Sequence, residues 1–178
     1  MKKLFFVVFL TIWFCSCYYD VEPPIIKVEP KVGTNNVLLI AEEFKYMGTD
    51  YKSSKKMWEL IAKKSVIYKD SNVDLEGIEV KFFKRGYVIS FLKGDKGKLY
   101  PNQNRTEITG NVVLENYQNK TKIMSSRLIW DGNEKVIYNT SSDKTVIVSP
   151  SATLRGSGLR TTPDVYPLEL ENVEAVIQ

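Results

Sequence analysis

The sequence predicts an all-β domain, and two observations carry that prediction. From about Lys56 to Ile177 the 178-residue chain runs in short segments in which apolar and polar residues alternate, as in GNVVLENY (110–117), KIMSSRLIW (122–130), KVIYNT (135–140) and KTVIVS (144–149). Polar turns such as YQNK and DGNEK separate the segments, and no helical pattern intervenes. Alternation with a period of two places one set of side chains on each face of a strand. Regularly spaced strands of this kind indicate a sandwich, barrel or roll.

The start of the chain predicts export rather than part of the fold. Lys2 and Lys3 precede an apolar run, residues 4–14, which is shorter than the 18 or more residues of a spanning helix. The run ends in Phe-Cys-Ser-Cys, which resembles a bacterial lipobox: Phe14 and Ser16 supply the large and the small residue expected before Cys17. We therefore expect residues 1–16 to be a lipoprotein signal peptide and Cys17 to carry the acyl chains, palmitate among them. A short uncleaved membrane anchor is the alternative.

The elements after the signal follow from local pattern. Residues 17–35 contain three prolines and are expected to form a lipidated tether, leaving 36–178 as the domain. Residues 36–46 are expected to form the first strand. Residues 52–64 are ambiguous, because the segment has good helix formers but Trp58, Leu60 and Ala62 also alternate.

Beyond residue 73 the pattern favours strands throughout. Ile78, Val80 and Phe82 alternate, Gly86 turns the chain, and residues 88–92 return. The glycines of LRGSGLR (154–160) suggest a bulge or a close approach of strands, since the segment lacks the ending of a phosphate loop. Pro163 and Pro167 bracket a looser segment before the last strand, LELENVEAVIQ, and almost no residues follow that could cover its edge.

Composition argues against catalysis. The chain has no histidine, which removes the usual general base and the commonest metal ligand, and its two cysteines both lie in the leader region. Carboxylates occur singly, as in Asp131 and Glu134 of one turn. Positive and negative residues are interspersed at a net charge of +4, so no basic stripe indicates nucleic acid. We expect no enzyme activity, no catalytic or metal-binding residues and no cofactor.

What remains is the apolar face. Alternation places one set of side chains toward a common interior: Trp58, Leu60, Ala62, Ile78, Val80, Phe82, Leu92, Val112, Leu114, Met124, Leu128, Trp130, Val146, Val148, Val173, Ala175 and Ile177. Such a face closes a dry core between two sheets, or it lines an open trough for acyl chains. The pattern alone does not separate the two.

Several segments in order resemble a known family. WELIA (58–62), LKGDKGKL (92–99), ITGNVV (108–113), SSRLIW (125–130) and GSGL (156–159) are similar to the LptC family, the periplasmic components of lipopolysaccharide export. The resemblance spans about residues 37–177. It implies an open twisted β-jellyroll (β-taco) of two antiparallel sheets, shared with the LptA-like and OstA-like proteins, and it favours a strand over a helix at WELIA.

The resemblance also implies a function and its partners. The protein would receive lipopolysaccharide from an inner-membrane ABC transporter permease jellyroll and pass it to a soluble LptA-like bridge protein toward the outer membrane. Phe82 and Ile177 match groove-lining positions of the family, and the full expected groove is Leu60, Ala62, Phe82, Leu92, Val112, Leu114, Leu128, Trp130, Val146, Ala175 and Ile177. The terminal strand, with Leu168, Leu170, Val173 and Ile177, would be the partner edge, and residues 37–44 would face the transporter.

Two departures from the family pattern stand in the sequence. A lipobox replaces the usual spanning helix, and Pro150-Ser151 stands where many members carry a glycine. The expected location is the periplasmic face of the inner membrane, with the outer membrane as the alternative. A β-sandwich surface lipoprotein that binds protein or carbohydrate is the alternative function.

Overall fold

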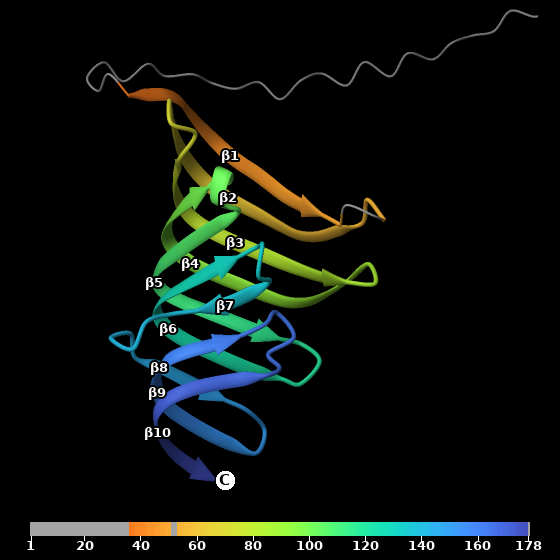
Figure 1. The fold of residues 1–178 in the computed structure, drawn as a ribbon, viewed down its shortest axis with the longest axis vertical. Coiled ribbons are helices and arrows are strands. Elements are labelled where there is room, and N and C mark those ends of the chain that lie inside the picture. Colours follow the sequence, from red (N-terminus) through yellow and green to blue (C-terminus); the bar gives the residue numbers. More distant parts are fainter. Residues whose placement is uncertain (1–35, 51–52, 178) are drawn as a thin grey trace, which may run out of the picture.

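The computed structural model describes residues 36–50 and 53–177 (Figure 1). The elements in chain order are β1 (Val37–Thr49), β2 (Lys56–Tyr68), β3 (Val73–Lys84), β4 (Tyr87–Tyr100), the 3₁₀ turn η1 (Pro101–Gln103), β5 (Arg105–Asn116), β6 (Thr121–Asp131), β7 (Val136–Tyr138), β8 (Thr145–Val148), β9 (Ala152–Thr161) and β10 (Leu168–Ile177). The prediction of an all-β fold is confirmed. The segment WELIA lies inside β2, so the strand interpretation of that ambiguous stretch is correct. The expected signal peptide, Cys17 and the tether lie outside the described residues.

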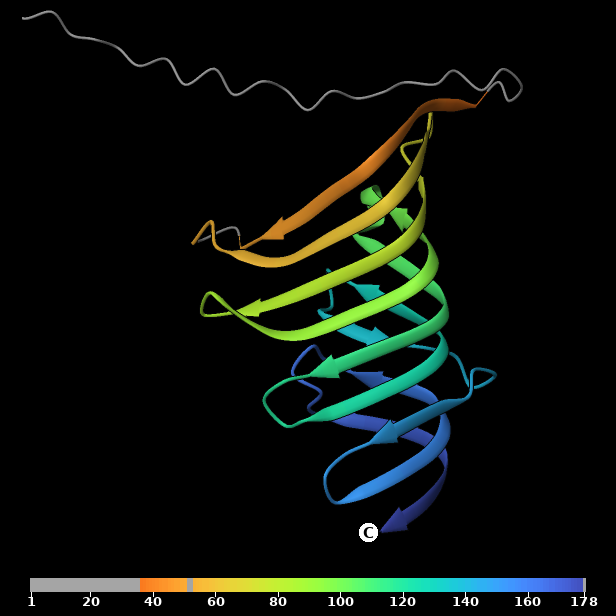
Figure 2. The same ribbon diagram turned by 180° about the vertical axis from the view of Figure 1, so that it is seen from behind.

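All strands belong to one antiparallel sheet of ten strands, in the order β1-β2-β3-β4-β5-β6-β7-β9-β10, with β8 pairing to β6 and β9. Except for β8, each strand lies beside its predecessor, because short turns connect the strands in a meander. The sequence predicts two sheets, and the structure joins them as two halves of one sheet. Figures 1 and 2 show the strands stacked along the long axis, with β1 at one end of the molecule and β10 at the other.

The two short strands β7 and β8 act together as one interrupted strand between β6 and β9. β7 pairs with residues 129–131 of β6, and β8 pairs with residues 122–125 of the same strand. The buried side chain of Asn139 fills the interruption: its Nδ2 donates to Thr145 Oγ1 at 2.8 Å, and its Oδ1 accepts from the backbone N–H of Leu159 at 2.7 Å. These bonds replace ladder hydrogen bonds that the broken strand lacks.

A row of irregular positions crosses the sheet and bends it. Pairing skips Glu43, Lys63, Gly77 and Asp95 on successive strands, and register shifts follow at residues 109–112 and 171–174. Several of these positions have a left-handed backbone, including Gly77 (φ 63°), Gly110 (φ 76°) and Asn172 (φ 49°). Bulges and left-handed residues kink a strand locally, so a row of them folds the sheet over. Figure 2 shows the resulting curvature of the long strands.

The bulge expected at LRGSGLR is confirmed. The pairing of β10 with β9 shifts register beside Ser157, and Gly158 has φ 57°. A Cβ on Gly156 would lie 2.5 Å from the backbone oxygen of Glu171, so the two strands approach more closely there than a side chain permits.

The two faces of the sheet differ in chemistry, as the alternation predicts. On the outer face β3 and β4 place opposite charges across from one another in three register pairs: Asp74 with Lys98, Glu76 with Lys96, and Glu79 with Lys93. On the inner face, apolar side chains from all strands except β1 and β10 form one buried cluster. Opposite charges on one face and apolar groups on the other hold a single register, since a shift by one residue would exchange the faces.

Candidate functional site

The predicted groove residues converge on the interior of the bent sheet. Eight of them belong to one buried cluster and are at most 2% exposed: Leu60, Ala62, Phe82, Leu92, Val112, Leu114, Leu128 and Trp130. They come from β2, β3, β4, β5 and β6, so the cluster runs through much of the stack. Side chains this deeply buried pack against one another, and the interior along these residues is therefore a packed apolar core.

Val146 does not join that cluster. In β8 the buried side chains are Thr145 and Ile147, whereas Val146 is half-buried. The pairing explains this, because Ile147 lies opposite the core residue Ile123 and Val146 lies opposite half-buried Met124. The predicted inward side of β6 and β8 is thus shifted by one residue here, and Met124, Val146 and Val148 lie on the outer face.

The two ends of the terminal strand differ in how far their side chains are buried. Leu168 and Leu170 are half-buried and pack against the core cluster, while Val173 is 50% exposed and Ala175 is exposed. The register shift beside Asn172 interrupts the alternation that the sequence suggests. Ile177 ends the strand, and its side chain is outside what the structure describes.

Both ends of the sheet present a strand with one neighbour. Among residues 36–50 and 53–177, β10 pairs only with β9, and β1 pairs only with β2. The two strands also carry exposed apolar side chains, with Leu38 and Met47 on β1 and Val173 and Val176 on β10. An uncovered edge is a template for a further strand. The described domain therefore offers one such edge at each end of its long axis.

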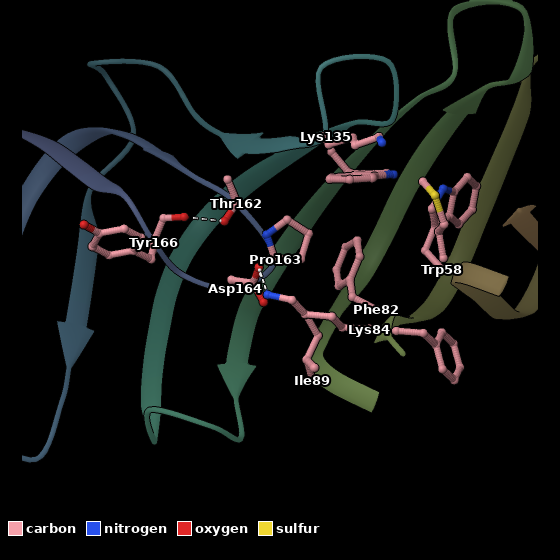
Figure 3. A pocket seen from close by; sticks show the side chains of 12 residues that line it. Trp58, Phe82, Lys84, Ile89, Lys135, Thr162, Pro163, Asp164 and Tyr166 are labelled. Atoms are coloured by element: carbon pink, nitrogen blue, oxygen red, sulfur yellow. Dashed lines mark hydrogen bonds and ion pairs between the residues drawn. The ribbon is translucent and has the colours of Figure 1, made fainter. Parts of the chain in front are cut away.

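The apolar interior reaches the surface at a pocket of about 440 Å³ near the β3–β4 turn. We call this pocket the mouth. Four members of the buried cluster line it: Trp58, Phe82, Ile89 and Trp130. The rings of Phe82 and Trp130 meet edge to face, with centroids 4.9 Å apart. The other lining residues are Met57, Phe83, Lys84, Lys135, Thr162, Pro163, Asp164 and Tyr166, most of which Figure 3 labels.

The segment 162–167, which connects β9 to β10 and which we call the strap, closes one side of the mouth. The backbone oxygen of Pro163 accepts from Ser90 Oγ and, at 3.2 Å, from Asn116 Nδ2. Lys84 Nζ lies 2.8 Å from Asp164 Oδ2. Figure 3 marks this ion pair with a dashed line. The buried side chain of Val165 packs into the core cluster. The strap thus joins the β9–β10 end of the chain to β3, β4 and β5.

Sequence reasoning missed the groups that hold the strap. Ser90 and Asn116 are both buried and polar, and Asn116 Nδ2 donates to Ser90 Oγ at 2.9 Å. Their positions in the alternation place both side chains on the interior face. Because both residues are polar, a search for apolar residues does not find them. The only signal in the sequence is the pair Pro163 and Pro167, which marks a segment unlike its surroundings.

Charged groups away from the mouth stabilise the outer loops. Arg127 lies 2.9 Å from Asp143 Oδ2 and 3.3 Å from Glu107 Oε1. Burial opposes ionisation of Asp143, but hydrogen bonds from Thr140 and Arg127 outweigh it, and the pKa of this carboxyl lies below its ordinary value. The hydrogen bond to Asp143 likewise raises the pKa of Arg127. Within residues 36–50 and 53–177, no group of histidine, cysteine or carboxylate side chains is arranged to hold a metal ion.

These features define the class of protein. Within the described residues, a single bent antiparallel sheet with an apolar interior and an unpaired edge strand at each end is a jellyroll-like fold. In the part of the chain that the structure describes, no helix is long and apolar enough to cross a membrane.

Comparison with known families identifies the chain further. It belongs to the LptC-related family of lipopolysaccharide-assembly proteins, whose sequence profile matches residues 4–177. A search among individual curated proteins finds no match. The family membership connects the chain with lipopolysaccharide transport at the periplasmic side of the inner membrane, in a family of transport components that is not known for enzymes.

Proposed function

We propose that this protein is a non-enzymatic carrier and bridge. It receives lipopolysaccharide from an inner-membrane ABC transporter and passes it to a soluble jellyroll bridge protein toward the outer membrane. The observation that carries the proposal is the mouth, where the core residues Trp58, Phe82 and Trp130 reach a surface pocket. An acyl chain that enters there gains about 0.8 kcal/mol for each CH₂ removed from water, while the sugars stay outside.

The interior must open for this to happen. The predicted lining residues Leu60, Leu92 and Leu114 are fully buried, so an acyl chain has to replace contacts between the two halves of the sheet. Among the apolar lining residues this exchange costs little, because one apolar contact replaces another. ATP hydrolysis in the transporter drives the lipid in one direction, away from the inner membrane.

The two uncovered edges support the bridging role. We propose that β10, through the predicted partner residues Leu168, Leu170, Val173 and Ile177, adds a strand of the soluble bridge protein, and that β1 pairs with the transporter's jellyroll. Strand addition of this kind uses main-chain hydrogen bonds for affinity and alternate side chains for specificity. Stacked jellyrolls would then share one continuous apolar interior.

We further propose that residues 1–16 are removed and that Cys17 carries lipid, with 17–35 as a tether. Two acyl chains hold a protein stably on a bilayer. Labelling cells with radioactive palmitate tests this: the native chain should incorporate the label and Cys17→Ala should not. Label in both forms, or in neither, would contradict lipidation at Cys17. Membrane fractionation then distinguishes inner from outer membrane.

Photo-crosslinking tests the carrier role. A photoreactive residue at position 82 or 177 should label lipopolysaccharide in cells, and one at the exposed outer-face position Lys96 should not. Equal labelling from positions 82, 177 and 96 would overturn the proposal, as would none from 82 and 177.

The closed packing of the core favours a second candidate. A surface lipoprotein of sandwich type that binds protein or carbohydrate needs no access to its interior, and the fully buried core is what such a protein would have. Crosslinking of a protein or polysaccharide from outer-face positions, with none of lipopolysaccharide from position 82, would support this candidate.

A further inference from the structure

Two buried polar atoms at the mouth lack hydrogen-bond partners. They are Trp130 Nε1 and Asp164 Oδ1, and both residues line the pocket. Trp130 is only 2% exposed, and its indole N–H can only donate. A buried donor without an acceptor is unfavourable, and such groups in native proteins mark a bound molecule, a water or a functional role. An oxygen acceptor that reached Trp130 Nε1 would therefore satisfy a donor that has no partner in the closed mouth.

The rim of the mouth is basic. A second, shallower pocket lies next to it, with Phe83 common to both walls. The charged residues that line the two pockets are five cations, Lys55, Lys56, Lys84, Arg85 and Lys135, and one carboxylate, Asp164. These cations come from three separate stretches of sequence, which the fold brings together; Lys84 is paired with Asp164 and Lys56 with Glu59, so the excess of positive charge is three. This charge favours an anionic ligand.

The order of these groups defines a ligand. Basic side chains line the mouth and the neighbouring pocket, Trp130 with its unpartnered N–H is a wall residue, and Phe82, Trp58 and Ile89 belong both to the wall and to the apolar core. An amphiphile with a phosphate, an ester or amide carbonyl and an acyl chain presents the matching groups in the matching order. Carbohydrate or peptide ligands present polar groups along their whole length and do not match the apolar end.

We propose that the mouth is a headgroup site for a phosphate-bearing acylated lipid. Lys84 holds the phosphate, Trp130 Nε1 donates to the carbonyl at the root of the acyl chain, and the chain extends along Phe82. The proposal rests on the proposed function, because it names the part of the lipid that this pocket recognises. It assigns Trp130 and Lys84 as binding residues.

The strap contributes to the proposed lipid site through Asp164. In the closed mouth Asp164 Oδ2 is 2.8 Å from Lys84 Nζ, so the carboxylate occupies the place that a phosphate oxygen would take. A phosphate bound to Lys84 displaces Asp164 and, with it, the side of the mouth that the strap closes. Displacement also returns the unpartnered Asp164 Oδ1 to water. Lys84 and Asp164 are therefore expected to affect lipid binding in opposite directions.

The test uses the mature full-length chain and three defined probes. Lysophosphatidic acid has phosphate, ester carbonyl and acyl chain; its ether-linked analogue lacks the carbonyl; a monoacylglycerol lacks the phosphate. Binding is measured by calorimetry below the micelle concentration. Trp130→Phe removes the N–H together with the five-membered ring of the indole, so both probes lose some apolar contact, but it should weaken the ester probe about fivefold more than the ether probe. The matched control is Tyr100→Phe, which removes one polar group from an aromatic side chain that lies beside Arg105 and does not line the mouth, and it should change the affinity for neither probe.

The charge pair is tested in the same way. Lys84→Met should weaken lysophosphatidic acid about fivefold and leave the monoacylglycerol unchanged, whereas Asp164→Asn should strengthen lysophosphatidic acid severalfold. The matched pair is Lys122 and Glu115, an exposed ion pair of 3.1 Å elsewhere on the sheet. Lys122→Met and Glu115→Gln should change no affinity.

Each outcome decides the proposal. Equal losses for the ester and ether probes in Trp130→Phe would overturn the carbonyl contact. Changes in the same direction for Lys84→Met and Asp164→Asn would show that the pair only holds the strap. Competition by inorganic phosphate as strong as by lysophosphatidic acid would overturn a lipid site. If none of the probes binds while position 82 still crosslinks lipopolysaccharide, the headgroup site is wrong and the carrier role stands. If the probes bind as expected while position 82 does not crosslink lipopolysaccharide, the headgroup site stands and the carrier role is wrong.

Discussion

Asn116 is the polar residue on which the strap depends most, and its replacement by alanine gives a measurable prediction. The side chain makes four hydrogen bonds: Nδ2 donates to Ser90 Oγ and to Pro163 O, and Oδ1 accepts from the backbone N–H groups of Gln118 and Asn119. Each such bond contributes about 0.5–1.5 kcal/mol net, and Asn116 is 2% exposed, so water does not replace the bonds inside the core. We expect Asn116→Ala to lower the free energy of unfolding by about 3 kcal/mol.

Urea denaturation followed by tryptophan fluorescence measures this loss, and thermal unfolding should show a decrease in Tm of about 10 °C. Asn133→Ala is the control, because Asn133 is exposed and its side chain makes hydrogen bonds only at the surface, to Asn104 and Gln103. The control should lose less than about 1 kcal/mol. Hydrogen exchange adds a local test, since the Val165 amide, which donates to Thr162 O within the strap, should lose protection in Asn116→Ala. A loss below about 1 kcal/mol, equal to that of the control, would refute the reasoning.

Two further predictions concern the outer face and the response to acid. Ile147→Ala should lower the free energy of unfolding by about 2–4 kcal/mol and Val146→Ala by less than about 1 kcal/mol, because only Ile147 belongs to the core; urea denaturation that ranks them the other way would contradict the observed inward side of β8. The lowered pKa of Asp143 means that its ionised form stabilises the fold at pH values above the ordinary carboxyl pKa of 3.8, and that this contribution is lost as the pH falls through the lowered value. Asp143→Asn should therefore be less stable than the native chain at pH 6, and the difference should shrink toward pH 2. A constant difference between the two proteins across that range would show that Asp143 acts without its charge.

Several features could be predicted from the sequence because they depend on local pattern. The alternation in residues 56–62 and 78–82 placed Leu60, Ala62 and Phe82 correctly on one buried face. The last strand was predicted at Leu168–Ile177 and is observed with those bounds. Period-two alternation is a property of a single strand, so a single strand is enough to reveal it.

Other features failed or were hidden because they depend on pairing. The inward-facing side of β8 was misassigned. The segment KTVIVS has apolar residues on both faces of the strand, so only the pairing of Ile147 with Ile123 shows which face is buried. Val173 and Ala175 do not take their expected interior position, because all side chains of residues 171–176 on this edge strand are exposed. The bulge beside Asn172, where the pairing with β9 changes register, was also hidden from the pattern. A bulge is set by two strands together, and neither strand alone encodes it.

The sequence by itself thus determined the class of this protein: an all-β chain without histidine, with an apolar face in place of a catalytic cluster, and with a family membership that connects it to lipopolysaccharide transport. Only the tertiary structure decided where that face reaches the surface. The mouth combines β2, β3, β4 and β6 with the strap, and its basic rim gathers residues as far apart as Lys55 and Lys135. The physical reason is that strand alternation is local, whereas the bend of the sheet, the closure of the strap over Lys84 and the buried, unpartnered nitrogen of Trp130 arise only when distant strands meet.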